Sequence, residues 1–257
     1  MKESIPVIIL CGGKGTRMGD QTIPKPLVEI GKRPVLWHVM QIFAAQGFDE
    51  FILALGYQGD LVKRYFLDYN WLSRDFTLTL GDGEPTYHTP ADAAHWRITF
   101  VDTGLETMTG ARLRKAARHV AGPRFFATYA DGVADIDLHA LLAYHRAQGT
   151  LATITTVHAY SRFGVMEIAD GKVTAYQEKP LHKTPINGGF FVFEQEALRY
   201  LEGDDALVLE QEPIRQLAAA GQLAAYPHAG FWRSMDTFKE AQELNALWEA
   251  GAPWKLW

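Results

Sequence analysis

A glycine-rich segment near the start of the chain could hold a phosphate group. Gly12-Gly13-Lys14-Gly15-Thr16-Arg17 follows a short apolar run. Glycines let a backbone approach phosphate oxygens closely, and the amides of such a loop point at the anion. The segment matches neither the dinucleotide fingerprint nor the Walker A pattern. Phosphate binding is one interpretation; a strand-to-helix turn in which glycine only relieves steric crowding is the other.

Lys25 adds a positive charge about ten residues further along. It stands between Pro24 and Pro26, which restrict the backbone on both sides. A single lysine is most often a solvated surface group. A stiffened lysine beside a loop that contains Arg17 is better suited to clamp an anion, and we predict that Lys25 does so.

Two aspartates follow apolar runs that read as buried strands. Asp131 follows residues 125–129, and Asp236 follows residues 231–235. Ligands of open α/β sheets bind at the carboxyl ends of the strands. Because Mg²⁺ prefers a few carboxylates together with phosphate oxygens and water, the pair predicts a magnesium site. The alternatives are a turn cap for Asp131 and a helix N-cap for Asp236.

Further polar residues lie in the second half of the chain. Glu178 and Asn187 could hydrogen-bond sugar hydroxyls, and Gly188 with Gly189 would let a ligand approach the backbone. A turn and a bulged strand would explain the same residues without a ligand. The nine histidines have neither zinc-protease spacing nor a recognisable triad.

Length and composition favour one large α/β domain. The 257 residues are 47% hydrophobic and carry a net charge of -5, with no run of Lys or Arg. We therefore expect no nucleic-acid partner. Nothing resembles a signal peptide or a membrane helix, so we expect a cytoplasmic protein without membrane contact. The single cysteine, Cys11, excludes an internal disulfide.

The candidate residues need a scaffold, and the hydrophobic pattern predicts one. Short apolar runs alternate with helical patterns, which indicates parallel βαβ units with helices on both faces of a mixed, mostly parallel sheet. The predicted strands are 6–10, 50–55, 97–101 and 124–129, and the predicted helices are 34–45, 61–68, 110–120 and 137–147. Residues 70–96 break the rhythm and read as an insertion or interaction loop. Residues 165–176 read as a hairpin with its turn at 169–172.

Taken together, the motifs resemble those of the sugar nucleotidyltransferase family, and most closely of the glucose-1-phosphate cytidylyltransferases. The similarity runs nearly end to end. It comprises 11–17, Lys25-Pro26, 28–31, 34–38, 101–104, 108–110, 129–133, 178–180, 187–191, 210–213, 230–237 and 252–255. The chain departs from the family pattern at Ala130, Ala111 and residues 81–95.

The resemblance implies a Rossmann-like, GT-A-like fold in a single domain, with a nucleotide-binding part at about 1–150 and a small sugar-binding β region within about 151–257. The implied nucleotide-binding residues are Leu10, Gly12, Gly13, Gly15, Thr16, Arg17, Lys25, Thr109 and Gly110. Glu178, Lys179, Asn187 and Gly188 would hold the sugar phosphate. Asp131 and Asp236 would bind Mg²⁺, and Arg17, Lys25 and Asp131 would be catalytic.

The reaction implied is attack by glucose 1-phosphate on the α-phosphorus of CTP, which releases pyrophosphate, and the resemblance also implies a homo-oligomer. Three alternatives stay open. The first is the same fold with another phosphorylated acceptor or another pyrimidine triphosphate. The second is a regulatory subunit without activity. The third is a nicotinamide-dependent oxidoreductase, against which the departure from G-x-G-x-x-G counts.

Overall fold

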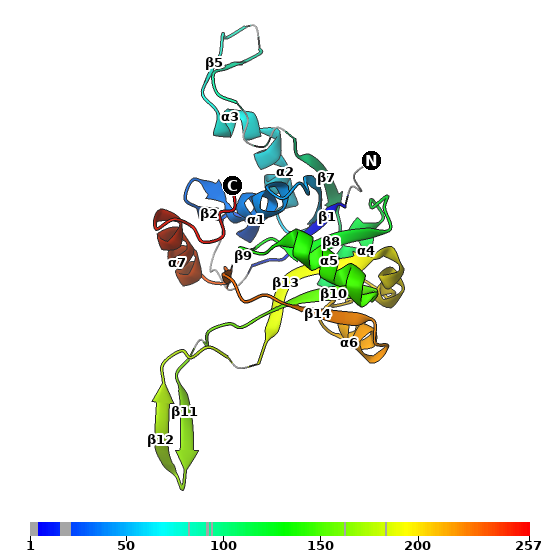
Figure 1. Cartoon of the computed structure of the whole chain (residues 1–257). Helices are drawn as coiled ribbons and strands as arrows, with labels where there is room; N and C mark the ends of the chain where they lie inside the picture. Colours follow the sequence, from blue (N-terminus) through cyan, green and yellow to red (C-terminus); the bar gives the residue numbers. More distant parts are fainter. Residues whose placement is uncertain are drawn as a thin grey trace.

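A computed structural model describes residues 5–15, 22–81, 83–90, 93, 95–161, 163–182 and 184–257. Its centre is a seven-stranded sheet with the order β14-β10-β13-β8-β1-β4-β7 (Figure 1). The strands are β1 (Val7–Leu10), β4 (Glu50–Leu55), β7 (Arg97–Asp102), β8 (Arg124–Tyr129), β10 (Ala152–Val157), β13 (Ile186–Glu194) and β14 (Leu223–Pro227). Within this sheet β13 alone runs against its neighbours. The mixed, mostly parallel sheet predicted from the sequence is confirmed.

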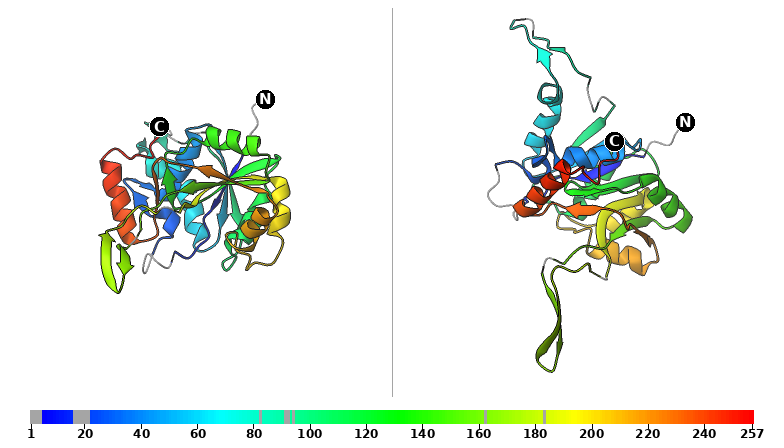
Figure 2. Two further views of the ribbon diagram at one scale, coloured as in Figure 1. Left: turned by 60° about the horizontal axis from the view of Figure 1, so that its bottom comes forward. Right: turned by 60° about the vertical axis from the view of Figure 1, so that its left-hand side comes forward.

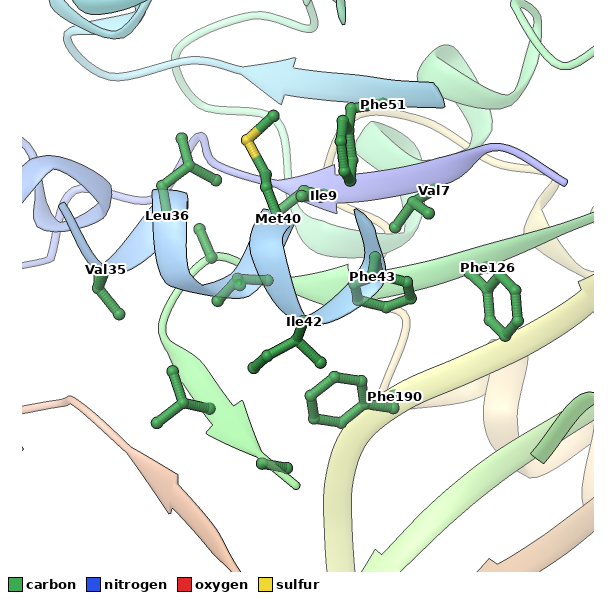
Figure 3. Close-up of a cluster of buried hydrophobic side chains, with 14 of the residues drawn as sticks. Val7, Ile9, Val35, Leu36, Met40, Ile42, Phe43, Phe51, Phe126 and Phe190 are labelled. Atoms are coloured by element: carbon green, nitrogen blue, oxygen red, sulfur yellow. The ribbon is translucent and has the colours of Figure 1, made fainter. Parts of the chain in front are cut away.

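Side chains alternate across the strands and so create two hydrophobic layers. Val7 and Ile9 of β1 join the core on one face, and Ile8 joins the core on the other. Figure 3 shows the first core, where Phe43 of a helix lies near Phe126 and Phe190 of the sheet. Each such buried side chain contributes about 1.5–3 kcal/mol.

Helices cover both faces, as predicted. Helices α1 (Val35–Ala44), α5 (Leu138–Gln148) and α7 (Phe238–Glu249) bury residues in the first core. The second core is covered by α4 (Thr109–Ala117), α6 (Glu212–Ala219) and the 3-10 helix η3 (Gln195–Leu201). Their bounds lie within three residues of the predicted ones wherever a helix was predicted, because their apolar stripes mark them clearly.

Small paired strands complete the fold: β2 (Glu29–Ile30) with β3 (Arg33–Pro34), β5 (Phe76–Thr77) with β6 (Thr86–Tyr87), β9 (Gly132–Ala134) with β15 (Trp232–Ser234), and β11 (Val165–Ala169) with β12 (Lys172–Gln177). The segment predicted as an insertion follows α2 (Gly59–Leu67). It contains most of α3 (Tyr69–Ser73) and the β5–β6 pair. Figures 1 and 2 show that this segment and the β11–β12 hairpin project from opposite ends of the molecule.

The β11–β12 hairpin is predicted correctly from its turn, but it lies outside the main sheet. Every residue of both strands is exposed. Its register pairs Met166 with Tyr176 and Ile168 with Val173, and an irregularity after Glu167 brings these pairs to one face. The hairpin therefore has an apolar face on which no other described residue packs, and Ile168 is 68% exposed.

Among the described residues, no helix combines the length and the apolar character that crossing a membrane requires.

Candidate active site

One lysine and two aspartates form the charged centre of the site. Lys25 Nζ lies 2.5 Å from Asp131 Oδ2 and 2.8 Å from Asp236 Oδ1. The lysine side chain is 15% exposed and each aspartate side chain is 26% exposed. Asp131 and Asp236 follow Lys25 in the chain by 106 and 211 positions. The fold thus brings together three residues that the sequence singled out separately.

Local structure explains how they meet. Lys25 opens the short 3-10 helix η2 (Lys25–Leu27), which begins after Pro24 and includes Pro26. Asp131 directly precedes β9, and Asp236 follows β15 after one residue. Because β9 and β15 pair antiparallel, with Gly132 opposite Ser234, the two aspartates emerge from the same end of this ribbon.

The pKa values in this cluster follow from burial and from the opposing charges. Burial acts to lower the pKa of Lys25, but Asp131 and Asp236 outweigh it, and its pKa lies above the ordinary value. Burial raises the pKa of Asp131, while Lys25 acts in the opposite direction. Lys25 is therefore a permanent cation between two acidic groups.

Asp236 does not cap helix α7. Thr237 is the N-cap: its hydroxyl accepts from the N–H of Glu240, and the Glu240 side chain accepts from the N–H of Thr237 in a capping box. Glu240 Oε2 also accepts from the N–H of Asp236 at 2.7 Å. The interpretation of Asp236 as an N-cap is thus wrong, and its carboxylate is directed to Lys25.

The donor set suits a magnesium ion that also binds substrate. No group of three or more His, Cys, Asp or Glu side chains within the described part of the chain could hold a metal by itself. Mg²⁺ is commonly bound by one or two carboxylates, with phosphate oxygens and water completing its shell. Asp131 and Asp236 already share one cation, Nζ of Lys25, so their carboxylates converge on a common point.

The glycine-rich segment leaves the sheet at the end of β1. Leu10, the last residue of β1, pairs with Ala54 of β4 and Tyr129 of β8. A Cβ added to Gly13 would meet no atom of the described residues within 4 Å, and Gly15 has a φ of 60° in the left-handed region. The described part of the chain thus leaves space beside Gly13. Two other predicted residues of the loop, Thr16 and Arg17, lie outside the described residues.

Thr109 and Gly110, predicted near the nucleotide, open helix α4. The Thr109 hydroxyl donates to Glu210 Oε2 at 2.6 Å and accepts from the N–H of Leu209 at 2.9 Å. A Cβ on Gly110 would come within 3.0 Å of the Leu207 carbonyl oxygen. Packing against the segment before α6 therefore explains the small residue at 110, and nucleotide contact by either residue stays a prediction.

Tyr129 links this region to the predicted sugar residues. Its hydroxyl donates a short hydrogen bond to Glu210 and accepts from Asn187 Nδ2 at 3.4 Å. Burial, with Glu210 nearby, raises the pKa of Tyr129, so the phenol stays protonated. Gly188 is also fixed, because its carbonyl accepts from Trp232 Nε1 at 2.7 Å. Asn187 and Gly188 thus lie beside the strand that leads to Asp131.

Lys179 and Glu178 follow the hairpin strand β12. Lys179 has a φ of 47° and lines a cleft of about 900 Å³ that also includes Asp236 and Trp232. Glu178 is exposed and accepts a short hydrogen bond from Tyr176. Lys179 thus shares a cleft with the charged centre, whereas no hydrogen bond of the described residues ties Glu178 to that centre.

Sequence reasoning missed three residues that organise this site. Glu210 joins Thr109 and Tyr129, and Arg112 lies buried beneath the glycine-rich segment. Tyr129 stood within a quoted motif but was given no role. Glu210 also stood within a quoted motif. Its contacts with Thr109 and Tyr129 could not be predicted, because these residues are far from it in the sequence. A lone arginine in a helix carries no signal of burial.

Comparison with known proteins identifies the family of the chain. Residues 6–249 match the pattern of the family described as "Nucleotidyl transferase". The chain is 43% identical to the "Probable glucose-1-phosphate cytidylyltransferase" of Bacillus subtilis, over 97% of this chain and 99% of that one. It is 42% identical to the glucose-1-phosphate cytidylyltransferase of Salmonella typhimurium, over 97% and 98% of the two chains.

A solved structure, HddC from Yersinia pseudotuberculosis, has the same fold, with a TM-score of 0.72, 19% sequence identity and coverage of 95% of this chain and 99% of that chain. The expected fold class is therefore confirmed. The chain belongs to the nucleotidyl transferase family.

Proposed function

We propose that the protein transfers a cytidylyl group from CTP to α-D-glucose 1-phosphate and releases CDP-glucose and pyrophosphate. The observation that carries the proposal is the cluster in which Lys25 lies between Asp131 and Asp236 at the sheet edge. The two relatives with 42% and 43% identity along nearly their whole length support the choice of CTP and glucose 1-phosphate.

The chemistry needs positioning and charge more than proton transfer. Both reactants are anions, so the protein must reduce their repulsion and stabilise the charge that grows on the α-phosphate and on pyrophosphate. Lys25 supplies one fixed positive charge, and Arg17 is proposed to supply another. The attacking phosphate oxygen is already ionised at neutral pH, so no general base is required.

Asp131 and Asp236 are proposed to hold Mg²⁺. Enzymes of this family generally use a divalent metal ion. The carboxylates of Asp131 and Asp236 converge on one cation, Lys25 Nζ, and this supports their choice as metal ligands. When bound, the ion neutralises phosphate oxygens and orients the triphosphate.

Glu178, Lys179, Asn187 and Gly188 are proposed to bind the sugar phosphate. Lys179 lines the cleft beside Asp236 and could pair with a phosphate, and Asn187 lies against Tyr129. The nucleotide would then lie over the loop from Gly12 to Arg17, with Thr109 and Gly110 nearby.

The test is pyrophosphate release measured with CTP, UTP, ATP and GTP against glucose 1-phosphate and other sugar 1-phosphates. We expect release only with CTP, glucose 1-phosphate and Mg²⁺ together. Another triphosphate or acceptor that works at least about tenfold better would replace the proposed pair, by the same kcat/KM comparison that defines specificity. Absence of release with every pair would favour a regulatory subunit.

We also propose a homo-oligomer in which the β11–β12 hairpin packs on a second copy. A two-stranded hairpin alone is marginally stable in water, so its apolar face needs a cover. The face with Met166, Ile168, Val173 and Tyr176 is exposed along its length. Four further exposed apolar residues lie at the end of α2 and in the segment that projects from the opposite end of the molecule: Leu67, Trp71, Leu72 and Leu80. The cytoplasmic location expected from the sequence stays a prediction that cell fractionation would test.

A further inference from the structure

A buried arginine lies under the glycine-rich segment and joins the ends of three strands. Arg112, on helix α4, is 4% exposed. Its Nη2 donates to the Gly12 carbonyl, after β1, and to the Leu105 carbonyl, both at 3.0 Å. Its Nη1 donates to the carbonyls of Leu55, at the end of β4, and Gly104, after β7. One guanidinium thus holds the carboxyl ends of β1, β4 and β7 together.

The contact with Gly12 fixes the direction of a peptide unit. The Gly12 carbonyl oxygen accepts from Arg112 and, at 3.2 Å, from the N–H of Tyr57. No peptide bond of the described residues is cis. In a trans peptide the C=O and the N–H point in opposite directions. Because the Gly12 carbonyl points at Arg112, the N–H of Gly13 in the same unit points away from it.

Two glycines of the segment have different neighbours. A Cβ on Gly12 would lie 2.2 Å from Arg112 Nη1, whereas a Cβ on Gly13 would meet nothing within 4 Å in the part of the chain that the structure describes. Glycine at position 12 is therefore required by the arginine beneath it. Gly13 lies on the open side, where its amide is accessible to an anion.

The charge of Arg112 also faces this segment. A guanidinium remains protonated in proteins. Among the described residues Arg112 forms no ion pair, and its hydrogen-bond partners are carbonyl oxygens and the Thr103 hydroxyl. The carboxylates of Asp102, Asp205 and Glu106 act on its charge without contacting it. Because no carboxylate of the described residues contacts the guanidinium, part of its positive charge remains to attract anions that approach from the other side of the loop.

We propose that Arg112 is a positioning residue for the triphosphate: it turns the Gly12 carbonyl inward, presents the Gly13 N–H to a phosphate group, and adds a positive charge beneath the loop. This inference rests on the proposed nucleotide transfer but not on the identity of the base or the sugar.

The test compares Arg112→Met and Arg112→Lys with Arg118→Met, which removes an exposed arginine at the end of the same helix. For Arg112→Met we expect the Kd of the Mg²⁺–CTP complex to rise at least about tenfold, while the KM for glucose 1-phosphate changes less than about twofold. Arg112→Lys retains the charge without the fork of donors and should lie between wild type and Arg112→Met. Arg118→Met should bind like wild type.

Gly12→Ala supplies a second measurement. In wild type the added methyl collides with Arg112, so nucleotide affinity should fall. In the Arg112→Met background, which has a flexible side chain there, the same change should cost less, giving a non-additive cycle. If Arg112→Met does not fold, Arg112→Lys with and without Gly12→Ala provides the same comparison.

Two results would overturn the inference: unchanged nucleotide affinity in Arg112→Met, or equal changes in the constants of both substrates together with a lower melting temperature, as for a purely structural role. Failure of the proposed function is distinguishable. If wild type binds ATP, UTP or GTP instead of CTP, the base assignment is wrong, and the Arg112 comparison proceeds with that triphosphate.

Discussion

The backbone N–H of Met235 donates a hydrogen bond of 2.9 Å to the carbonyl oxygen of Asp131. This bond extends the pairing of β9 and β15 to the residues next to both candidate metal ligands. The backbone of Asp131 is therefore bonded to the residue that precedes Asp236, and a ligand that binds both meets a preformed pair of carboxylates.

Lys25→Ala should lower kcat by about a hundredfold or more, because a fixed charge beside the reacting phosphates is lost. Lys25 lies in a short 3-10 helix between two partly exposed carboxylates, so the fold should persist. Initial rates and a thermal melt measure both effects. Lys172→Ala, at an exposed hairpin position, is the control. A Lys25→Ala enzyme with half the wild-type turnover would remove Lys25 from the site.

Asp236→Asn should weaken Mg²⁺ binding and lower turnover by about a hundredfold, with a melting temperature close to wild type. Thr237→Ala should do the reverse: lose about 1 kcal/mol of stability, because it removes the N-cap, and keep the magnesium dependence. The two readouts are turnover against Mg²⁺ concentration and urea unfolding. Unchanged magnesium dependence in a folded Asp236→Asn protein would exclude the metal role.

His38 should make stability depend on pH. It is fully buried among Trp37, Trp248 and Trp254, and burial lowers its pKa from 6.5 to about 4. Its Nε2 lies 2.9 Å from the Ile30 carbonyl oxygen, while Nδ1 accepts from Trp254, as the neutral ring allows.

Between pH 6.5 and 4 the unfolded chain binds more protons than the folded one at this residue, so its contribution to stability falls as the pH falls. The loss reaches about 3 kcal/mol at the acid end of that window. Urea unfolding from pH 4.5 to 7.5 should show a shallower pH dependence for His38→Gln than for wild type. His119→Gln, at an exposed position, should follow wild type. Parallel curves for wild type and His38→Gln would contradict the assignment.

Ile168→Glu should separate the subunits by placing a charge on the apolar face of the hairpin. Ala175→Glu places the same charge on the opposite face, beside Glu167, and should leave the assembly intact. Light scattering coupled to size-exclusion chromatography gives the mass of each variant. A wild-type protein that elutes as a monomer would refute the proposed oligomer.

Much of the fold could be predicted because its signals are local. The strands around Ile8 and Ile52 are uninterrupted apolar runs that end at glycine, and the run around Phe126, residues 125–129, is apolar except for Thr128 within it. The aspartates at strand ends could be selected because topology brings such ends to one edge. The partners of Lys25 and the burial of Arg112 could not be predicted from the sequence, because these contacts join residues about a hundred or more positions apart. The exposure of the β11–β12 hairpin could not be predicted either, because its apolar residues are of the kind expected in a strand with one buried face.

The reversed direction of β13 determines how the chain passes the carboxyl ends of the parallel strands, the edge of the sheet at which the ligands are proposed to bind. Strand β10 ends at that edge, the hairpin departs from it, and β13 begins there because it runs antiparallel to both β10 and β8. With β13 parallel, the chain would have to cross back to the far edge first, and Asn187 and Gly188 would begin their strand there. Because β13 is inverted, β10 and β13 are joined at this edge and the chain does not have to cross the sheet between them. The residues proposed to bind the two substrates therefore lie along the same edge of the sheet.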